Sequence, residues 1–250
     1  VKFQQVYFVV DEEFRLLWIG GEWDEAALAN GGSDARSNEV LSTSLLSHIT
    51  DEPTRRATQA MAEAAAREWD AQQGAIKPET MPVTRAVNSA IDKLVHQRDE
   101  VIDLLAAYGA SDLLCYRATG PEGLITRQML GWDPLLGWSA LELAAPLVVT
   151  AGIVPVAQPV ESLVRLKATV ASFDAFQLAA FHDFVAITGS LILGIAITRG
   201  RLSAAEAFAL SRIDESWQAE FWGVDEDAAA LEAAKQRALL EAEQFYALCR

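Results

Sequence analysis

The sequence predicts an α+β fold, in which a small β-rich N-terminal domain precedes a larger, mainly α-helical domain. The first fifty residues contain two short runs rich in β-branched and aromatic residues, whereas later apolar residues recur at helical spacing between helix caps. With 250 residues, 51% of them hydrophobic, the chain can bury a sizeable core. We therefore expect a β-rich domain at residues 1–50 and a helical domain at residues 51–250.

The two β runs are Val6–Val10 and Phe14–Ile19, separated by acidic residues. Runs of this composition joined by a short polar segment are typical of a β-hairpin. The glycines at 20–21 close the second strand, and Asn30-Gly31-Gly32-Ser33 marks a loop.

Helical patterns begin at Asp51, which can cap a helix over residues 54–73 with Pro53 near its start. A second helix is predicted from Pro82 to about His96, and helix continues from Asp99 to Tyr108. The apolar stripe of the second helix is expected to consist of Val83, Val87, Ile91 and Val95, widened by Ala86, Ala90 and Leu94. Residues 112–117 fit a strand or one more helical turn equally well.

The second half of the chain is also mainly helical in pattern. Asp133-Pro134 resembles a cap and first turn for a helix over Leu135–Leu143. Residues 147–156 are apolar and bounded by prolines, which predicts a buried connector or short strand. The remaining predicted helices are a buried apolar one from Asp174 to Gly200 that passes through Gly189-Ser190, one opened by the capping box Ser203–Glu206 and closed by Gly223, and one over Asp225–Leu248.

Charge and composition narrow the classes of partner. The formal net charge of −15 argues against nucleic-acid backbones and anionic membrane surfaces. The uncharged run Phe184–Thr198 is shorter than the roughly 20 residues that span a bilayer, so no membrane insertion is expected. Cys115 and Cys249 are expected to be reduced thiols. No targeting segment is visible, which favours a bacterial cytoplasm, or a mitochondrial matrix if a presequence has been removed.

Groups suited to catalysis are sparse, so we expect no enzyme, cofactor or metal. The three histidines are scattered, and phosphate-binding, nucleophile-elbow and zinc motifs are missing from the sequence. His182 and Asp183 are adjacent on a helix and are expected to diverge. An alternative remains open: a small-molecule enzyme whose acid/base site joins Asp214 or Glu215 to His182 in a helical cleft, which predicts convergence in one pocket. A structural oligomer and self-association also stay open.

The segment from Ser211 to Gly223 is the most informative of the chain because it combines aromatic and charged residues. Trp217 and Phe221 are four residues apart, so we expect them to share an inward face. Trp222 then lies with Gln218 and either Glu215 or Asp214 on a mixed polar and aromatic face. Such a face is typical of an anchor for a protein partner, although buried core is the simpler interpretation.

Ordered segments of the sequence resemble the Atp12 family, the assembly chaperones of the F1 part of ATP synthase. They are residues 81–92, 111–118, 132–138 and 211–223, with a similar helix at 176–193. The resemblance implies a small β-rich domain before a helical one, and binding of the F1 α subunit before it joins β. It implies no cofactor and no turnover. Residues 1–38 match the family poorly and receive no functional assignment.

The resemblance also implies partner-binding residues. The polar and aromatic positions of its motifs correspond here to Arg85, Asn88, Asp92, Trp132, Trp138, Arg212, Asp214, Glu215, Gln218 and Trp222. Glu215 is the first candidate for an acid that contacts the partner, whereas Asp133 is interpreted as a helix cap. The acidic surface is expected to complement a basic patch on the α subunit.

Overall fold

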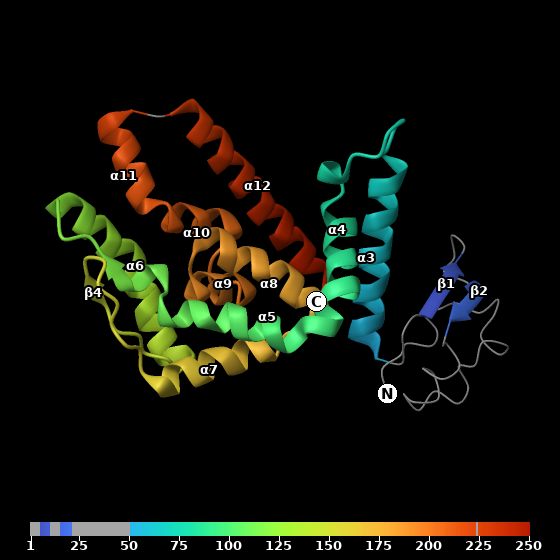
Figure 1. The fold of residues 1–250 in the computed structure, drawn as a ribbon, viewed down its shortest axis with the longest axis horizontal. Helices are drawn as coiled ribbons and strands as arrows, with labels where there is room; N and C mark the ends of the chain where they lie inside the picture. Colours follow the sequence, from blue (N-terminus) through green and yellow to red (C-terminus); the bar gives the residue numbers. More distant parts are fainter. Residues whose placement is uncertain (1–5, 11–15, 22–50, 224) are drawn as a thin grey trace. The chain divides into compact units, whose positions relative to one another are not determined.

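The computed structural model describes residues 6–10, 16–21, 51–223 and 225–250, which are mainly α-helical (Figure 1). The chain divides into two compact units, residues 1–63 and residues 64–249. Within the described residues, no helix combines the length and apolar character needed to cross a membrane. Cys115 and Cys249 are free and buried.

The predicted hairpin is confirmed. Strand β1 (Val6–Val10) pairs antiparallel with β2 (Leu16–Gly21), with Val6 opposite Gly21. The predicted α+β fold class with a small β-rich N-terminal domain is nevertheless wrong, because these two strands are the only ones described before residue 51. A two-stranded hairpin is smaller than the sheet of three or more strands that an independent β domain needs. The predicted loop at 30–33 lies outside the described residues, and the boundary at residue 50 stays a prediction.

Helices form most of the rest. They are α3 (Glu52–Asp70), η2 (Pro78–Thr80), α4 (Pro82–Ser89), η3 (Ala90–Leu94), α5 (Val95–Ala107), η4 (Tyr108–Ala110), η5 (Leu113–Cys115), α6 (Glu122–Glu142), α7 (Val160–Ala171), α8 (Ala175–Thr188), α9 (Leu191–Thr198), α10 (Ala204–Ser211), α11 (Ile213–Trp222) and α12 (Glu226–Leu248). Strands β3 (Tyr116–Arg117) and β4 (Thr150–Ala151) pair in parallel.

Local capping starts several helices where the sequence predicts it. The Asp51 carboxylate accepts a hydrogen bond from the Thr54 backbone nitrogen at 2.9 Å, ahead of α3. Ser203 and Glu206 form the expected capping box at α10, and Asp225 caps α12. Each cap satisfies backbone donors that the first helical turn leaves unpaired.

The core of residues 64–249 is centred on α8 and α9. Every residue of α9 is buried. Helix α8 packs against α4, α5, α9, α10 and α12, and Figure 1 shows it between α5 and the C-terminal helices. Phe181, Phe184 and Phe245 are fully buried and fill the space between these elements. The prediction of a buried apolar helix in this region is confirmed.

That helix is interrupted, which the sequence does not predict. Gly189 adopts a left-handed conformation with φ of 70° and ends α8. Ser190 is not inside a helix but begins the next one, because its Oγ accepts a hydrogen bond from the Leu193 nitrogen at 3.0 Å. Glycine adopts positive φ without a steric cost, so one apolar run forms two helices.

Asp133 and Pro134 do not begin a helix. Both lie inside α6, which runs from Glu122 to Glu142. The Asp133 carboxylate accepts a hydrogen bond from Arg117 Nη2 at 2.7 Å instead of capping a first turn. The predicted cap is therefore wrong, because the packing of α6 outweighs a local signal.

Residues 147–156 are extended, as predicted, but they are not buried. Ile153 and Val154 are 92% and 70% exposed. Gln158 supports this segment by accepting a hydrogen bond from the Val148 nitrogen at 2.7 Å and donating one to the Val148 carbonyl at 2.9 Å. The chain therefore presents an apolar strap on its surface.

The helices α4, η3 and α5 follow one another directly, and η3 is a π-helical turn. The predicted stripe is right for Ala90 and Leu94, which are buried, but wrong for Ile91 and Val95, which are 51% and 59% exposed. A π turn adds a residue to the helical repeat and so rotates the following side chains to another face. π turns inside helices occur frequently at functional sites.

Candidate functional site

The predicted partner-binding residues fall in two regions within residues 64–249. One region is α11 with the part of α6 that it contacts. The other is a cavity whose wall includes α4 and η3.

Helix α11 has no buried residue. Glu215 and Gln218 are exposed, and Trp222 is 79% exposed. Glu215 pairs with Arg212 Nη1 at 3.0 Å, whereas Gln218 forms no hydrogen bond within the described residues. These three side chains are accessible to a partner.

Asp214 lies next to Glu215 in sequence but has a different environment. Its Oδ1 accepts a hydrogen bond from Gln128 Nε2 at 2.6 Å, and Gln128 Oε1 accepts one from the Ala118 nitrogen at 2.8 Å. Gln128 is only 1% exposed. Asp214 therefore links α11 to Gln128 of α6, and Gln128 in turn binds the segment after β3. The Asp214 carboxylate supplies the acceptor that the buried Gln128 amide needs.

Arg212 connects α11 to its neighbours. Its Nη2 donates to the Ile187 carbonyl at 2.6 Å at the end of α8, and its Nε lies 3.7 Å from Glu232 on α12. The guanidinium also lies over the Phe208 ring, 5.5 Å from the centroid. A half-buried arginine with these contacts has a structural role in addition to any contact with a partner.

The two tryptophans of the 132–138 segment differ. Trp132 is 1% exposed, and its Nε1 donates to the Leu210 carbonyl at 2.8 Å. It therefore has no surface to offer a partner. Trp138 is half-buried beneath Arg201, whose guanidinium carbon lies 5.6 Å from the ring centroid.

Trp217 and Phe221 contact each other, with ring centroids 4.9 Å apart, but the predicted inward face is wrong, because Phe221 is 63% exposed. Trp217 lies against α6, where a Cβ added to Gly123 would stand 2.6 Å from its ring. No local spacing in the sequence indicates that Trp217 packs against Gly123. Because Phe221 is largely exposed, part of the aromatic pair stays open to solvent.

Arg127 of α6 contacts both Trp217 and Glu220 of α11, a role that the sequence does not indicate. Its guanidinium carbon lies 4.8 Å from the Trp217 ring centroid. Its two terminal nitrogens bind the Glu220 carboxylate at 2.6 and 2.7 Å. These hydrogen bonds lower the pKa of Glu220. A bidentate pair combined with ring stacking is the geometry for which arginine is suited.

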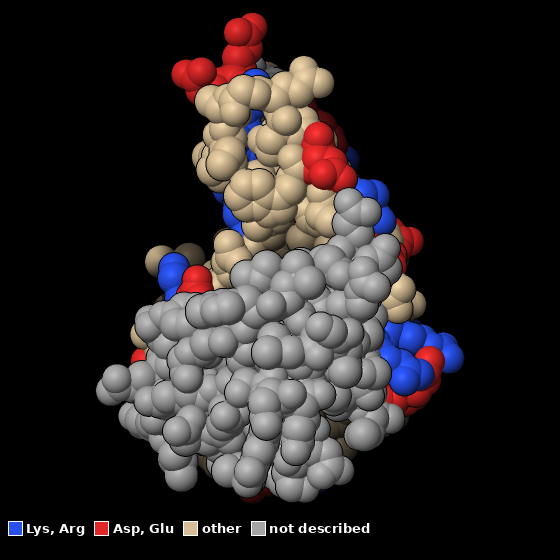
Figure 2. Space-filling view, turned by 90° about the vertical axis from the view of Figure 1, so that its right-hand side faces the viewer, with Lys and Arg blue, Asp and Glu red and all other residues tan. Residues whose placement is uncertain are grey.

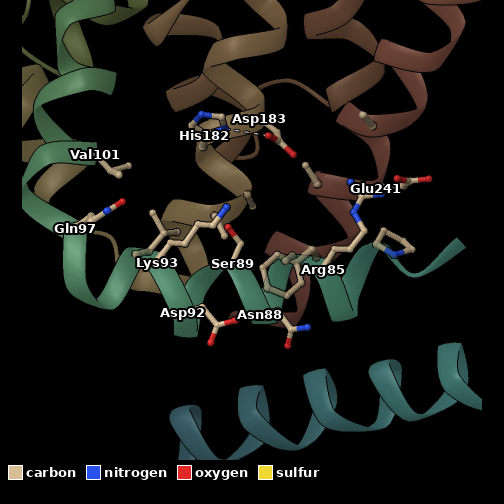
Figure 3. A pocket seen from close by; sticks show the side chains of 18 of the residues that line it. Arg85, Asn88, Ser89, Asp92, Lys93, Gln97, Val101, His182, Asp183 and Glu241 are labelled. Atoms are coloured by element: carbon tan, nitrogen blue, oxygen red, sulfur yellow. Dashed lines mark hydrogen bonds and ion pairs between the residues drawn. The ribbon is translucent and has the colours of Figure 1, made fainter. Parts of the chain in front are cut away.

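The second region is a cavity of about 670 Å³. It is lined by residues of α4, η3, α5, α8 and α12, and Figure 3 shows it from close by. Arg85, Asn88 and Asp92 are all among its lining residues, on the wall formed by α4 and η3. Its floor includes the buried side chains of Leu94, Ala180 and Phe245.

Glu68 positions the wall of this cavity. Its two carboxylate oxygens accept hydrogen bonds from the Val83 and Thr84 nitrogens at 2.7 and 2.8 Å. A carboxylate at a helix N-terminus satisfies free backbone donors and interacts favourably with the helix dipole. Glu68 lies on α3 and is separated from α4 by a loop. Its contact with the start of α4 therefore cannot be recognised from local sequence spacing.

His182 and Asp183 also line the cavity. Contrary to the expectation that they diverge, His182 Nδ1 lies 3.0 Å from Asp183 Oδ1, and this hydrogen bond raises the pKa of His182. Neither Asp214 nor Glu215 lines this cavity. The acid/base constellation that the alternative enzyme hypothesis requires is therefore not assembled.

Asp112 is a fully buried carboxyl group that no sequence pattern singles out. It accepts hydrogen bonds from Ser190 Oγ at 2.7 Å and from the Ile192 and Leu114 nitrogens at 3.0 Å. Burial raises its pKa to about 6 against these lowering hydrogen bonds. The group joins the segment before η5 to the start of α9, so its role is structural.

Lys or Arg side chains and Asp or Glu side chains are both visible on the face that Figure 2 shows. In the view of Figure 2, Lys and Arg side chains lie among Asp and Glu rather than forming a patch of one sign. Among the described residues, no group of three or more His, Cys, Asp or Glu side chains is arranged to hold a metal ion.

The chain resembles known proteins along most of its length. Residues 22–140 match the family model of the ATP12 chaperone protein, which includes part of the segment that the sequence analysis left unmatched. The mitochondrial protein atp12 of Schizosaccharomyces pombe is 29% identical over 178 residues, 67% of this chain. The chain spans 61% of the length of that relative.

Two solved structures are similar as well. The crystal structure of Atp12 from Paracoccus denitrificans is 51% identical, with a TM-score of 0.76 over 79% of this chain and 84% of that chain. A candidate chaperone from Agrobacterium tumefaciens is 32% identical, with a TM-score of 0.70 over 97% of this chain and 84% of that chain.

Proposed function

We propose that this chain, which belongs to the Atp12 family, is an assembly chaperone that binds the α subunit of F1 ATP synthase and prevents its misassociation before it joins β. The observation that carries the proposal is the 51% identity to Atp12 of Paracoccus denitrificans over 79% of this chain. The partner would be held in the compartment where F1 assembles, a bacterial cytoplasm or a mitochondrial matrix.

Exposed apolar side chains support the proposal. Leu141, Ile153 and Val154 are 84%, 92% and 70% exposed, and Phe221 and Trp222 add aromatic surface on α11. Exposed apolar groups that lie together mark sites of protein contact, and Phe221 and Trp222 are adjacent on α11. A chaperone that shields a subunit needs such groups and has no need of converging catalytic residues.

Among the predicted residues, we assign direct contact to the exposed ones: Glu215, Gln218 and Trp222 on α11, Arg85 in the cavity, and Asn88 and Asp92 on the other side of its α4–η3 wall. Trp138 contributes through its accessible edge. Arg212 and Asp214 would hold α11 in position, and Trp132 would support it from the core.

The negative charge of this chain favours a basic surface on the partner opposite α11. The chain carries a formal net charge of −15, and Glu215 is a carboxylate on the exposed face of α11. Opposite charges on two proteins speed their encounter and set their orientation, and salt screens them. We expect binding to weaken with increasing salt, and salt-insensitive affinity would contradict this part of the proposal.

The test is co-purification of the chain with isolated F1 α subunit, comparing wild type with Glu215→Lys. The reversal should abolish capture while circular dichroism stays native, because Glu215 is exposed and Arg212 keeps its other contacts. The matched control is Asp103→Lys, which breaks an exposed ion pair with Lys167 between α5 and α7. Absence of capture by wild type would refute the proposed function.

A further inference from the structure

The cavity bordered by α4, η3, α5, α8 and α12 contains two basic side chains without ion-pair partners. Arg85 and Lys93 form no salt bridge within the described residues, although the chain has 35 acidic against 20 basic residues. Other basic residues of the described part, such as Arg127 and Lys235, are paired with carboxylates. Two unpaired cations in one cavity of an acidic protein are available to a ligand.

Figure 3 shows how the charges around this cavity are oriented. Arg85 and Lys93 extend from the α4–η3 wall toward α8 and α12, whereas Asn88 and Asp92 point to the opposite side of that wall. The Asp183 carboxylate is already engaged by His182 at 3.0 Å. Glu241, on α12, and Asp92, which points away from α8 and α12, are the other acidic groups among the lining residues. The α4–η3 wall therefore offers cations to the interior.

The rest of the cavity is apolar. Leu94, Ala180 and Phe245 are buried beneath it, and Val101 and Leu104 line its side. A volume of about 670 Å³ accommodates several side chains of a partner. Apolar walls with few polar groups are typical of binding pockets, where the polar groups set the orientation of the ligand.

We propose that this cavity receives an acidic side chain, together with the apolar residues beside it, from a segment of the bound α subunit, and that Lys93 and Arg85 are its basic contacts. The occupant follows from charge complementarity with the α4–η3 wall and from the apolar floor. The inference rests on the proposed function and gives the client a second point of attachment, separate from α11.

The first test measures the affinity of purified F1 α subunit for Lys93→Glu. We expect Kd to rise about 10-fold or more, because the reversal opposes an acid in a partly desolvated site. The matched control is Lys77→Glu, which makes the same charge change at an exposed lysine outside the cavity; its Kd should stay within about 2-fold of wild type. Equal affinities of the two variants would overturn the inference.

A second variant tests the cavity without changing charge. Ala179 lines it and is half-buried, so Ala179→Trp would fill it, and Kd should rise as it does for Lys93→Glu. Thermal unfolding checks that the variant stays folded. If Ala179→Trp binds normally while Lys93→Glu does not, the lysine contacts the client outside the cavity and the inference fails. If wild type binds no α subunit, the proposed function itself fails.

Discussion

Asp112 is a carboxyl group whose ionisation is coupled to folding. Burial raises its folded-state pKa from 3.8 to about 6. A raised folded-state pKa means that the folded chain binds the proton more tightly than the unfolded chain. The resulting stabilisation is complete below pH 3.8 and is lost as the pH rises through about 6.

We therefore predict a pH-dependent difference between wild type and Asp112→Asn. The unfolding free energy of wild type minus that of the variant should decrease from pH 4 to pH 7, by up to about 3 kcal/mol. Urea denaturation at several pH values measures it, and other titrating groups cancel in the difference. A difference independent of pH would show that the carboxyl group ionises normally in the fold.

The neighbouring acids Asp214 and Glu215 should respond differently to truncation. Asp214→Ala leaves the amide of buried Gln128 without its acceptor, which costs about 1–3 kcal/mol of unfolding free energy. Glu215→Ala removes only an exposed ion pair and should cost less than about 1 kcal/mol. Urea denaturation of both variants checks this, and equal losses would argue against the assigned roles.

Helix α11 is positioned by a close contact with α6. Gly123 has no side chain and so leaves space for the Trp217 ring. The Arg127 guanidinium stacks on that ring and also binds the Glu220 carboxylate. Because α11 has no buried residue, this contact and the hydrogen bond of Asp214 carry much of its attachment. A helix with little buried surface opens more readily than the core.

Gly123→Ala should therefore displace Trp217, because the added Cβ would lie 2.6 Å from the ring. We expect a loss of about 1–3 kcal/mol and a changed near-ultraviolet circular dichroism spectrum. Gly137→Ala is the control in the same helix, where nothing lies within 4 Å; it should stabilise by about 0.5–1 kcal/mol. Matching effects of both substitutions would contradict the proposed contact.

The molecule combines an enclosed helical core with apolar groups that remain on its surface. Fully buried α9 and the aromatic residues around α8 supply stability, so exposed residues of the strap and of α11 are available for other contacts. This arrangement suits a protein that binds a subunit temporarily, since the binding residues can change without loss of the core.

Trp222→Ala should weaken binding of the F1 α subunit at least 10-fold without changing stability, because exposed tryptophans often anchor interfaces. The matched control is Trp69→Ala, which removes another exposed tryptophan, on α3. Titration calorimetry or light scattering from aggregating α subunit measures the difference. Equal binding by the two variants would remove Trp222 from the proposed contact surface.

The sequence alone was sufficient to identify the family, the hairpin and most helix N-termini. The caps at Asp51, Ser203 and Asp225 are recognisable because each uses a hydrogen bond spanning three residues. The buried apolar run before Gly200 was also visible. Such features depend on neighbours in the chain, which a sequence displays directly.

The arrangement of helices decided the rest. The α+β class, the cap at Asp133 and the inward placement of Phe221 were wrong, because burial depends on elements that arrive from distant parts of the chain. The roles of Asp214, Gln128 and Glu68 likewise required partners that are far apart in sequence. Hydrogen bonds and packing between remote segments are not encoded in local spacing, so only the folded molecule separates structural side chains from those that remain free to bind.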